Sequence, residues 1–347
     1  MRVLTRLTRG ARSPWLRGGL LAVVLMFCGY GLYAEWPQVT AGLARLHWYG
    51  IAASLAAAMA GATCMMLAWR AILADLGSPL PLRAAARINF VAQPGKYIPG
   101  AVWAFAAQVE LGHDLGVPRR RSVASYVVSI SLAVGAGLGL AAVALPLASP
   151  GMARQYWWVM AAAPLIVACL CPPVFGWLVD RALKIAKRAP LERRPTWRGL
   201  GRALAWTLLG WLLLGVQVWL LISEMSGRSG YLVLAVGGYA LAFAAGMLLI
   251  VVPGGLGARE VILIAALSPV IPGAAVAVAV MARVVTMASD LACAGLGLAV
   301  SRGLRAPVDR ELSPPAGKHR RTSSRSAAAY RAPARSESAG GAPVAMK

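Results

Sequence analysis

Apolar runs of about twenty residues recur along the chain and alternate with short polar stretches rich in arginine. A run of this length spans the ~30 Å hydrocarbon core of a bilayer, because an α-helix rises ~1.5 Å per residue. The pattern therefore predicts an all-α polytopic membrane protein with about six full spans. We expect these spans at residues 19–33, 50–73, 122–148, 157–178, 203–222 and 274–300.

The first run follows an arginine-rich stretch and so resembles a secretory signal. A cleavage site of small residues would be needed directly after it, whereas the chain continues with Leu32, Tyr33 and Ala34. We therefore interpret the run as an uncleaved first helix.

Residues 82–111 form an apolar segment that does not fit as an ordinary span. Two pairs, Pro94-Gly95 and Pro99-Gly100, interrupt its middle. Proline removes a backbone donor and glycine weakens a helix, so each flanking piece is about half a span long. We interpret the segment as a re-entrant helical hairpin that enters from the cytoplasmic side. Two amphipathic helices lying on the membrane surface are the alternative.

A second irregular segment, residues 231–267, is broken at Pro253, Gly254, Gly255 and Gly257. Its second leg, residues 258–267, is too short to span the bilayer. By the same topology this segment enters from the opposite side, as a second re-entrant hairpin. Interrupted segments at corresponding places in two halves of a chain are typical of transport sites built from inverted repeats.

The placement of charge sets the orientation of these spans. Of all residues 59% are hydrophobic and 14% charged, with 35 Lys and Arg against 12 Asp and Glu, which excludes a soluble globular protein. The basic residues gather before the first run, in the loops 119–121 and 181–202, and after residue 300. Loops rich in Lys and Arg stay on the cytoplasmic side, so both termini are predicted to be cytoplasmic.

This division predicts three parts: a basic N-terminus at 1–18, a transmembrane domain at 19–300 and a disordered basic tail at 301–347. Because topology accounts for the basic clusters, we do not expect a nucleic acid as partner. The bilayer itself is the expected surrounding.

The sequence contains no motif for self-contained catalysis. The cysteines are odd in number and lie within apolar runs, which excludes a disulfide framework. No spacing for a metal, a nucleotide or an activated nucleophile occurs. We therefore expect neither catalytic residues nor a metal or cofactor, and we expect that the protein is not an enzyme.

Two cations lie where the broken segments resume as helices. Lys96 stands beside the first restart, where Pro99 suits the first helical position, and Arg259 lies in the first turn after Gly257. A cation there opposes the helix dipole, whereas an anion such as phosphate binds favourably at a helix N-terminus. Alternatively, Lys96 extends to the membrane surface, and Arg259 lies shallower or pairs with a carboxylate. Glu260 fits a capping role as well as a binding one.

The last span carries Arg283 and Asp290 near its middle, where each charge costs about 2.5–3.5 kcal/mol. They are about 10 Å apart along the axis, so each needs a partner elsewhere. Asp290 can neutralise Arg259 or Lys96 when no ligand is bound, and a purely structural ion pair is the alternative. The candidate substrate-binding residues are Lys96, Arg259, Glu260, Arg283 and Asp290.

The two breaks, INFVAQPGKYIPGAVWAF at 88–105 and VVPGGLGAREVIL at 251–263, resemble the signature pair of the lysylphosphatidylglycerol synthase transmembrane-region family. The resemblance covers about residues 48–300. It implies a flippase-like protein of the bacterial cytoplasmic membrane, without the soluble aminoacyl transferase that some members carry. The matching positions are Pro94, Gly95, Lys96, Pro99, Gly100, Pro253, Gly254, Gly255, Gly257, Arg259 and Glu260.

Together these features predict translocation of an anionic lipid or a lipid-linked intermediate, with its phosphate between two half-helix N-termini. A first alternative is a non-transporting scaffold that holds a glycosyl transferase or another cell-envelope enzyme at the membrane. A second is an enzyme acting on lipid head groups, for which Glu260 and Asp290 are the candidate acid–base residues.

Overall fold

The computed structural model describes residues 37, 40, 44–97, 103–148, 154, 172–185, 195–248, 257–272 and 274–300, and the regular elements among them are helices. They are α4 (Trp48–Asp75), α5 (Leu82–Ala92), the 3₁₀ helix η1 (Gln93–Tyr97), α6 (Trp103–Asp114), α7 (Arg119–Ala148), α10 (Pro172–Ile185), α11 (Trp197–Ser226), α12 (Leu232–Leu248), α13 (Ala258–Leu267) and α14 (Ala275–Val300).

Four of these helices, α4, α7, α11 and α14, are long and apolar enough to cross a membrane. They contain the predicted spans 50–73, 122–148 and 203–222 and all but the first residue of 274–300, which are thereby confirmed as helices. The predicted span 19–33 and most of 157–178 lie outside the described residues.

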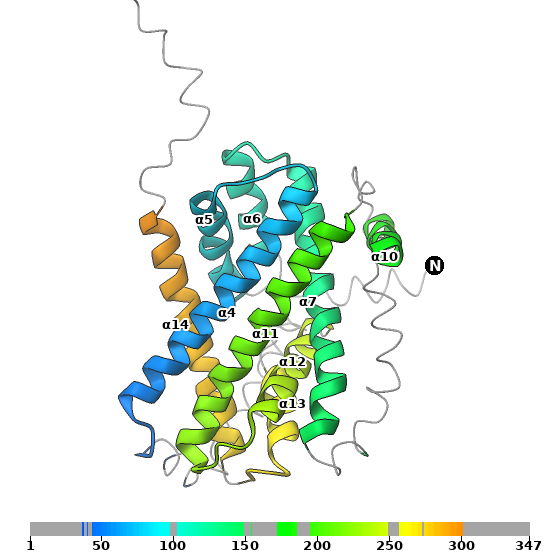
Figure 1. The fold of residues 1–347 in the computed structure, drawn as a ribbon. Coiled ribbons are helices and arrows are strands. Elements are labelled where there is room, and N and C mark those ends of the chain that lie inside the picture. Colours follow the sequence, from blue (N-terminus) through cyan, green and yellow to red (C-terminus); the bar gives the residue numbers. More distant parts are fainter. Residues whose placement is uncertain are drawn as a thin grey trace, which may run out of the picture.

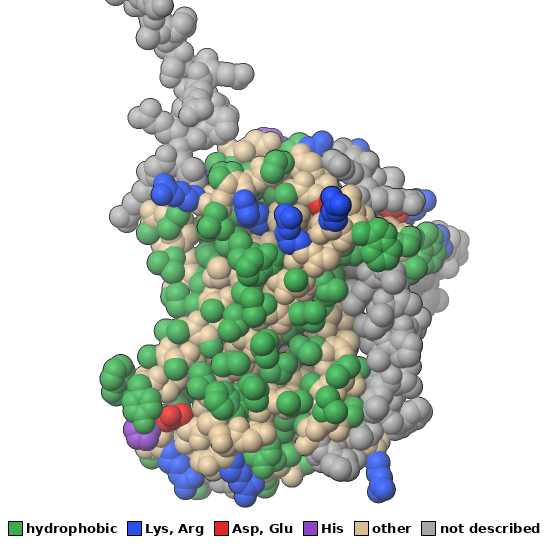
Figure 2. All heavy atoms as spheres, in the orientation of Figure 1, with side chains coloured by type: hydrophobic (Ala, Val, Ile, Leu, Met, Phe, Trp, Pro, Cys, Tyr) green, Lys and Arg blue, Asp and Glu red, His purple; other side chains and the backbone are tan. Residues whose placement is uncertain are grey.

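The outer surface of the bundle matches an apolar environment. Figure 2 shows hydrophobic side chains over the middle of one face, with Lys and Arg gathered near its two ends. Large apolar side chains exposed on α11 and α14 include Leu208, Leu209, Leu212, Val284 and Leu291. A contiguous exposed apolar surface of this kind marks contact with a membrane.

The first broken segment is interrupted where the sequence predicts. Helix α5 ends at Ala92, and the chain continues through η1, which contains Pro94 and Gly95, before α6 begins at Trp103. A Cβ on Gly95 would lie 2.8 Å from the backbone nitrogen of Ala104, so glycine is what allows η1 to pack against the start of α6. Pro99 and Gly100 lie outside the described residues.

The second broken segment consists of α12 and the ten-residue α13, which begins directly after the break. Gly257 caps α13 with a positive φ of 81°, a conformation that a glycine adopts without steric cost. Pro253, Gly254 and Gly255 lie outside the described residues. In Figure 1, α5 and α6 lie at one end of the bundle, and α12 and α13 lie toward the other.

Helix α14 joins the two broken segments. It packs against α5 and η1 from the first segment and against α13 from the second. The approach to α5 is close, because a Cβ on Gly297 would lie 3.2 Å from the carbonyl oxygen of Ala86. Side chains on α14 are therefore within reach of both breaks.

Candidate functional site

A cavity of about 210 Å³ lies among the long helices and the two broken segments. Its charged lining residues are Lys96 from η1, Arg259 from α13 and Asp290 from α14. The two cations that the sequence places at the helix restarts therefore face one common space. Most of the remaining lining is apolar and includes Met65, Ile72, Phe90, Ile130, Leu214 and Met247.

Lys96 forms an ion pair with Asp290, with 2.7 Å between Nζ and Oδ2. The Tyr97 hydroxyl donates a hydrogen bond to the same carboxylate oxygen. Asp290 is only 5% exposed, so this buried carboxylate is held by a cation and a hydroxyl from the first break. Of the two partners considered for Asp290, the structure selects Lys96.

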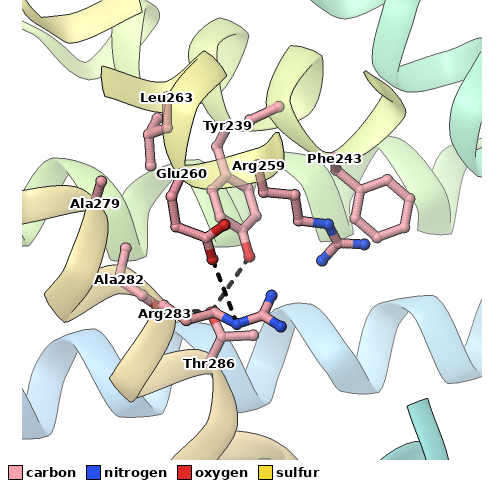
Figure 3. A pocket seen from close by; sticks show the side chains of 10 residues that line it. Tyr239, Phe243, Arg259, Glu260, Leu263, Ala279, Ala282, Arg283 and Thr286 are labelled. Atoms are coloured by element: carbon pink, nitrogen blue, oxygen red, sulfur yellow. Dashed lines mark hydrogen bonds and ion pairs between the residues drawn. The ribbon is translucent and has the colours of Figure 1, made fainter. Parts of the chain in front are cut away.

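Arg283 pairs with Glu260, with 3.5 Å between Nε and Oε1, as Figure 3 shows. The other carboxylate oxygen of Glu260 accepts a hydrogen bond of 2.7 Å from the backbone N–H of Gly257. Glu260 thus caps α13, as its position in the first turn predicts, and also joins α13 to α14. Arg283 and Asp290 each find a partner on another element, as their spacing predicts.

Arg259 is the cation of the site without a carboxylate at ion-pair distance among the described residues. Its guanidinium carbon lies 4.2 Å from the centroid of the Phe243 ring, and Figure 3 shows the side chain extending beside that ring. Its Nε is buried and has no hydrogen-bond partner within the described part of the chain. Gly246 makes room for this side chain, since a Cβ there would lie 2.6 Å from Cγ of Arg259.

The charges of the site do not balance. Among the residues that the structure describes, three cations, Lys96, Arg259 and Arg283, accompany two carboxylates, Glu260 and Asp290, which leaves one positive charge. Both Arg259 and Arg283 lie within electrostatic range of Lys96. Because a buried charge is costly without a counter-charge, the site favours one additional anion.

Several residues of the site were not foreseen from the sequence. Tyr97 bonds Asp290, and its ring lies 5.3 Å from the Arg283 guanidinium. The Tyr239 hydroxyl lies 3.3 Å from the Thr286 hydroxyl, which Figure 3 also shows. Tyr239 and Phe243 are four residues apart on α12, a spacing that places two aromatic residues on one helix face. This pair of aromatic residues, on the helix that precedes the second break, is the sequence signal that could have indicated them as site residues.

The fold and the site define a class: an α-helical integral membrane protein in which two interrupted helix pairs meet at a charged cavity. Residues 15–293 match the family described as Lysylphosphatidylglycerol synthase TM region, and the chain belongs to this family. The match includes both broken segments and Asp290. A search of curated proteins found no match.

Proposed function

We propose that this protein binds an anionic lipid, or a lipid-linked intermediate, by its phosphate in the cavity and moves the head group across the membrane. The observation that carries the proposal is Arg259, a cation without a carboxylate partner in the described chain that lines an otherwise mostly apolar cavity.

An anion is favoured because Arg259 lies in the first turn of α13, beside the free N–H groups of that helix. A phosphate there receives charge-assisted hydrogen bonds from the guanidinium and gains from the helix dipole. The planar guanidinium can engage two phosphate oxygens at once, which an ammonium group cannot do in the same way. The Arg259 guanidinium lies over the face of the Phe243 ring, and this contact holds the Arg259 side chain in place.

A lipid is favoured because most of the cavity wall is apolar. A small hydrophilic anion would leave that wall in contact with water, whereas an amphipathic molecule covers it with hydrocarbon. The bundle also exposes apolar side chains on its outer surface. The acyl chains of a lipid can lie against them while they remain in the bilayer. One molecule with a phosphate and an alkyl portion satisfies both parts of the lining.

Crossing is favoured by the way the two broken segments converge on α14. When the phosphate approaches, it competes with Asp290 for Lys96, and when it leaves, the 2.7 Å ion pair can form again. This exchange keeps the affinity for the phosphate moderate, because the Asp290 carboxylate can replace the phosphate as the partner of Lys96. A transport site needs that property, since a ligand held too tightly is not released.

Reconstitution into vesicles tests the proposal. Phosphatidic acid labelled on one acyl chain is placed in one leaflet, and its appearance in the other is timed for wild type, Arg259→Ala, Lys96→Ala and Arg83→Ala. Arg83 is an exposed arginine on α5 and provides the matched control. We expect wild type and the control to exceed protein-free vesicles, and the two site variants to be at least tenfold slower. Equal rates in all four proteins would remove Arg259 and Lys96 from the mechanism, and rates equal to protein-free vesicles would favour the scaffold alternative.

A further inference from the structure

A second, much smaller cavity lies between α12, α13 and α14 and shares part of its lining with the large one. Its volume is about 20 Å³, and Figure 3 shows the side chains that line it. A space of this size holds one water molecule or one monatomic ion, because a single water needs about 10–15 Å³. A phosphate group is too large for it, so the small cavity is distinct from the proposed lipid site.

Arg259 contributes to the walls of both cavities. Its Nε is buried, carries a hydrogen and finds no acceptor for it among the residues that the structure describes. Buried polar side-chain atoms are nearly always hydrogen-bonded. The guanidinium also keeps its charge, because arginine does not lose its proton in proteins. This nitrogen therefore indicates an acceptor that the described chain does not supply.

Positive charge is in excess around the small cavity. Arg259 and Arg283 both line it, and Glu260 is the carboxylate among its described lining residues. Glu260 already pairs with Arg283 and accepts the hydrogen bond from the backbone of Gly257. Figure 3 shows the two guanidinium groups and the Tyr239 hydroxyl around one space. A neutral water molecule would leave the charge of Arg259 unbalanced, whereas a monovalent anion cancels it.

The Tyr239 hydroxyl supplies a second donor. Its oxygen lies 3.3 Å from the Thr286 hydroxyl oxygen, which is longer than the ~2.5–3.0 Å typical of hydrogen bonds between two oxygens. The Thr286 hydroxyl donates its own proton to the carbonyl oxygen of Ala282, at 2.7 Å. The Tyr239 proton can therefore turn toward a ligand in the cavity. An anion accepts hydrogen bonds without donating any, so it suits a cavity in which Arg259 and Tyr239 both donate.

We propose that the small cavity binds a chloride ion in the lipid-free protein, held by Nε of Arg259 and by the Tyr239 hydroxyl. Chloride is a monatomic monovalent anion, so it fits both the volume and the missing charge. Apolar side chains complete the lining and include Ala242, Leu263 and Ala279. They exclude water, and the low local dielectric constant strengthens both contacts. The site requires no lipid and so does not depend on the proposed function.

A chloride ion in this place makes lipid binding sensitive to salt. When the phosphate of a lipid engages Arg259 from the large cavity, two anions share one cation and repel each other. Chloride should therefore weaken lipid binding, and the lipid should weaken chloride binding by the same factor. Coupling between two sites typically amounts to about 5- to 150-fold, and we expect at least about fivefold here. This coupling, unlike the chloride site itself, rests on the proposed function.

Binding of radiolabelled chloride to the purified full-length protein in detergent tests the site. Sodium gluconate keeps the ionic strength constant, because gluconate is too large for the cavity. Wild type should bind chloride saturably, and Arg259→Ala should lose this binding. Tyr239→Phe keeps the ring and removes the hydroxyl, so its affinity should fall about tenfold or more, as expected for a hydrogen bond to a charged group. Tyr126→Phe is the matched control, because Tyr126 lines the large cavity and not the small one, and it should bind chloride as wild type does.

A crystal of the wild-type protein grown in bromide protects the test against a folding defect in the variants. Bromide is a halide like chloride, and its anomalous scattering marks its position. We expect a peak beside Nε of Arg259 and the Tyr239 hydroxyl. A cavity without a peak, as a water molecule would leave it, overturns the proposal. Chloride binding that is absent from wild type, or unchanged in Tyr239→Phe, overturns it as well.

Adding phosphatidic acid separates this proposal from the proposed function. A fall of at least about fivefold in the affinity for chloride supports both. An affinity for chloride that saturating lipid leaves unchanged means that the phosphate does not reach Arg259, so the proposed function is wrong and the chloride site stands. Lipid binding that requires Arg259, in a protein that binds no chloride, removes the chloride site and leaves the phosphate site.

Discussion

Replacing Asp290 by asparagine removes a charge while keeping the shape of the side chain. The amide oxygen can still accept a hydrogen bond from Tyr97, but Lys96 loses its counter-charge. The excess of positive charge in the site then rises from one to two. Asp290→Asn should therefore lower the stability of the lipid-free protein and raise its affinity for an anionic lipid.

The size of the first effect follows from burial. Removing one partner of a fully buried ion pair costs about 3–5 kcal/mol. The Lys96 side chain is 28% exposed while that of Asp290 is 7% exposed, so the freed ammonium group regains part of its hydration. We expect the free energy of unfolding without lipid to fall by about 2–3 kcal/mol, below the range for a fully buried pair.

The size of the second effect follows from Coulomb's law. Two unit charges 4 Å apart interact by about 4 kcal/mol at an effective dielectric constant of about 20. Partial hydration of Lys96 reduces this, and a gain of about 1.4 kcal/mol corresponds to tenfold tighter binding of the phosphate. A site that binds more tightly releases more slowly, so translocation should become slower despite the higher affinity.

The assay is thermal unfolding in detergent, with and without phosphatidic acid. Asp290→Asn should melt below wild type without lipid and should gain more from added lipid than wild type does. The control is Asp114→Asn, because Asp114 is exposed at the end of α6 and outside the cavity lining. If lipid raises the melting temperature of Asp290→Asn by no more than that of wild type, Lys96 does not bind the phosphate and the reasoning is refuted.

Three further substitutions test the surroundings of the site by the same unfolding assay. Glu260→Gln should cost about 2–3 kcal/mol, because it leaves the charge of Arg283 without its carboxylate; a wild-type melting curve would contradict the ion pair. Gly95→Ala should cost about 1–3 kcal/mol through overpacking against the backbone of Ala104, and an unchanged stability would contradict the close approach of η1 to α6. Trp211→Ala should cost about 3–5 kcal/mol, because this fully buried ring packs in the core beside the cavity; a smaller cost would mean that the core refills the space.

The long helices could be predicted from the sequence because their signal is local. An apolar run of sufficient length has few structures open to it in a bilayer, so the bounds predicted for α4, α7 and α14 lie within three residues of those observed. Helix α11 begins six residues before the predicted span 203–222 and ends four residues after it. The breaks are equally local, since Pro94 and Gly95 disrupt a helix wherever it lies. The cap by Gly257 and Glu260 also depends on residues only three apart.

The partners within the site could not be predicted in the same way. The sequence indicates how deep Asp290 lies in its helix, but not which neighbouring helix faces it, so Lys96 and Arg259 remained equal candidates. The pair of Arg283 with Glu260 depends on the rotation of α14 against α13, which packing of the whole bundle determines. Tyr97 carries no charge, and its role becomes visible once Asp290 is placed beside it.

The most direct test of the account is an experimental structure of the full-length protein with phosphatidic acid bound. The account predicts the phosphate inside the cavity, about 2.7–2.9 Å from a guanidinium nitrogen of Arg259, as charge-assisted hydrogen bonds require. It also predicts that Lys96 has turned from Asp290 toward the phosphate. A phosphate bound on the outer surface of the bundle, with Arg259 facing only Phe243 and the Lys96–Asp290 pair intact, would contradict it.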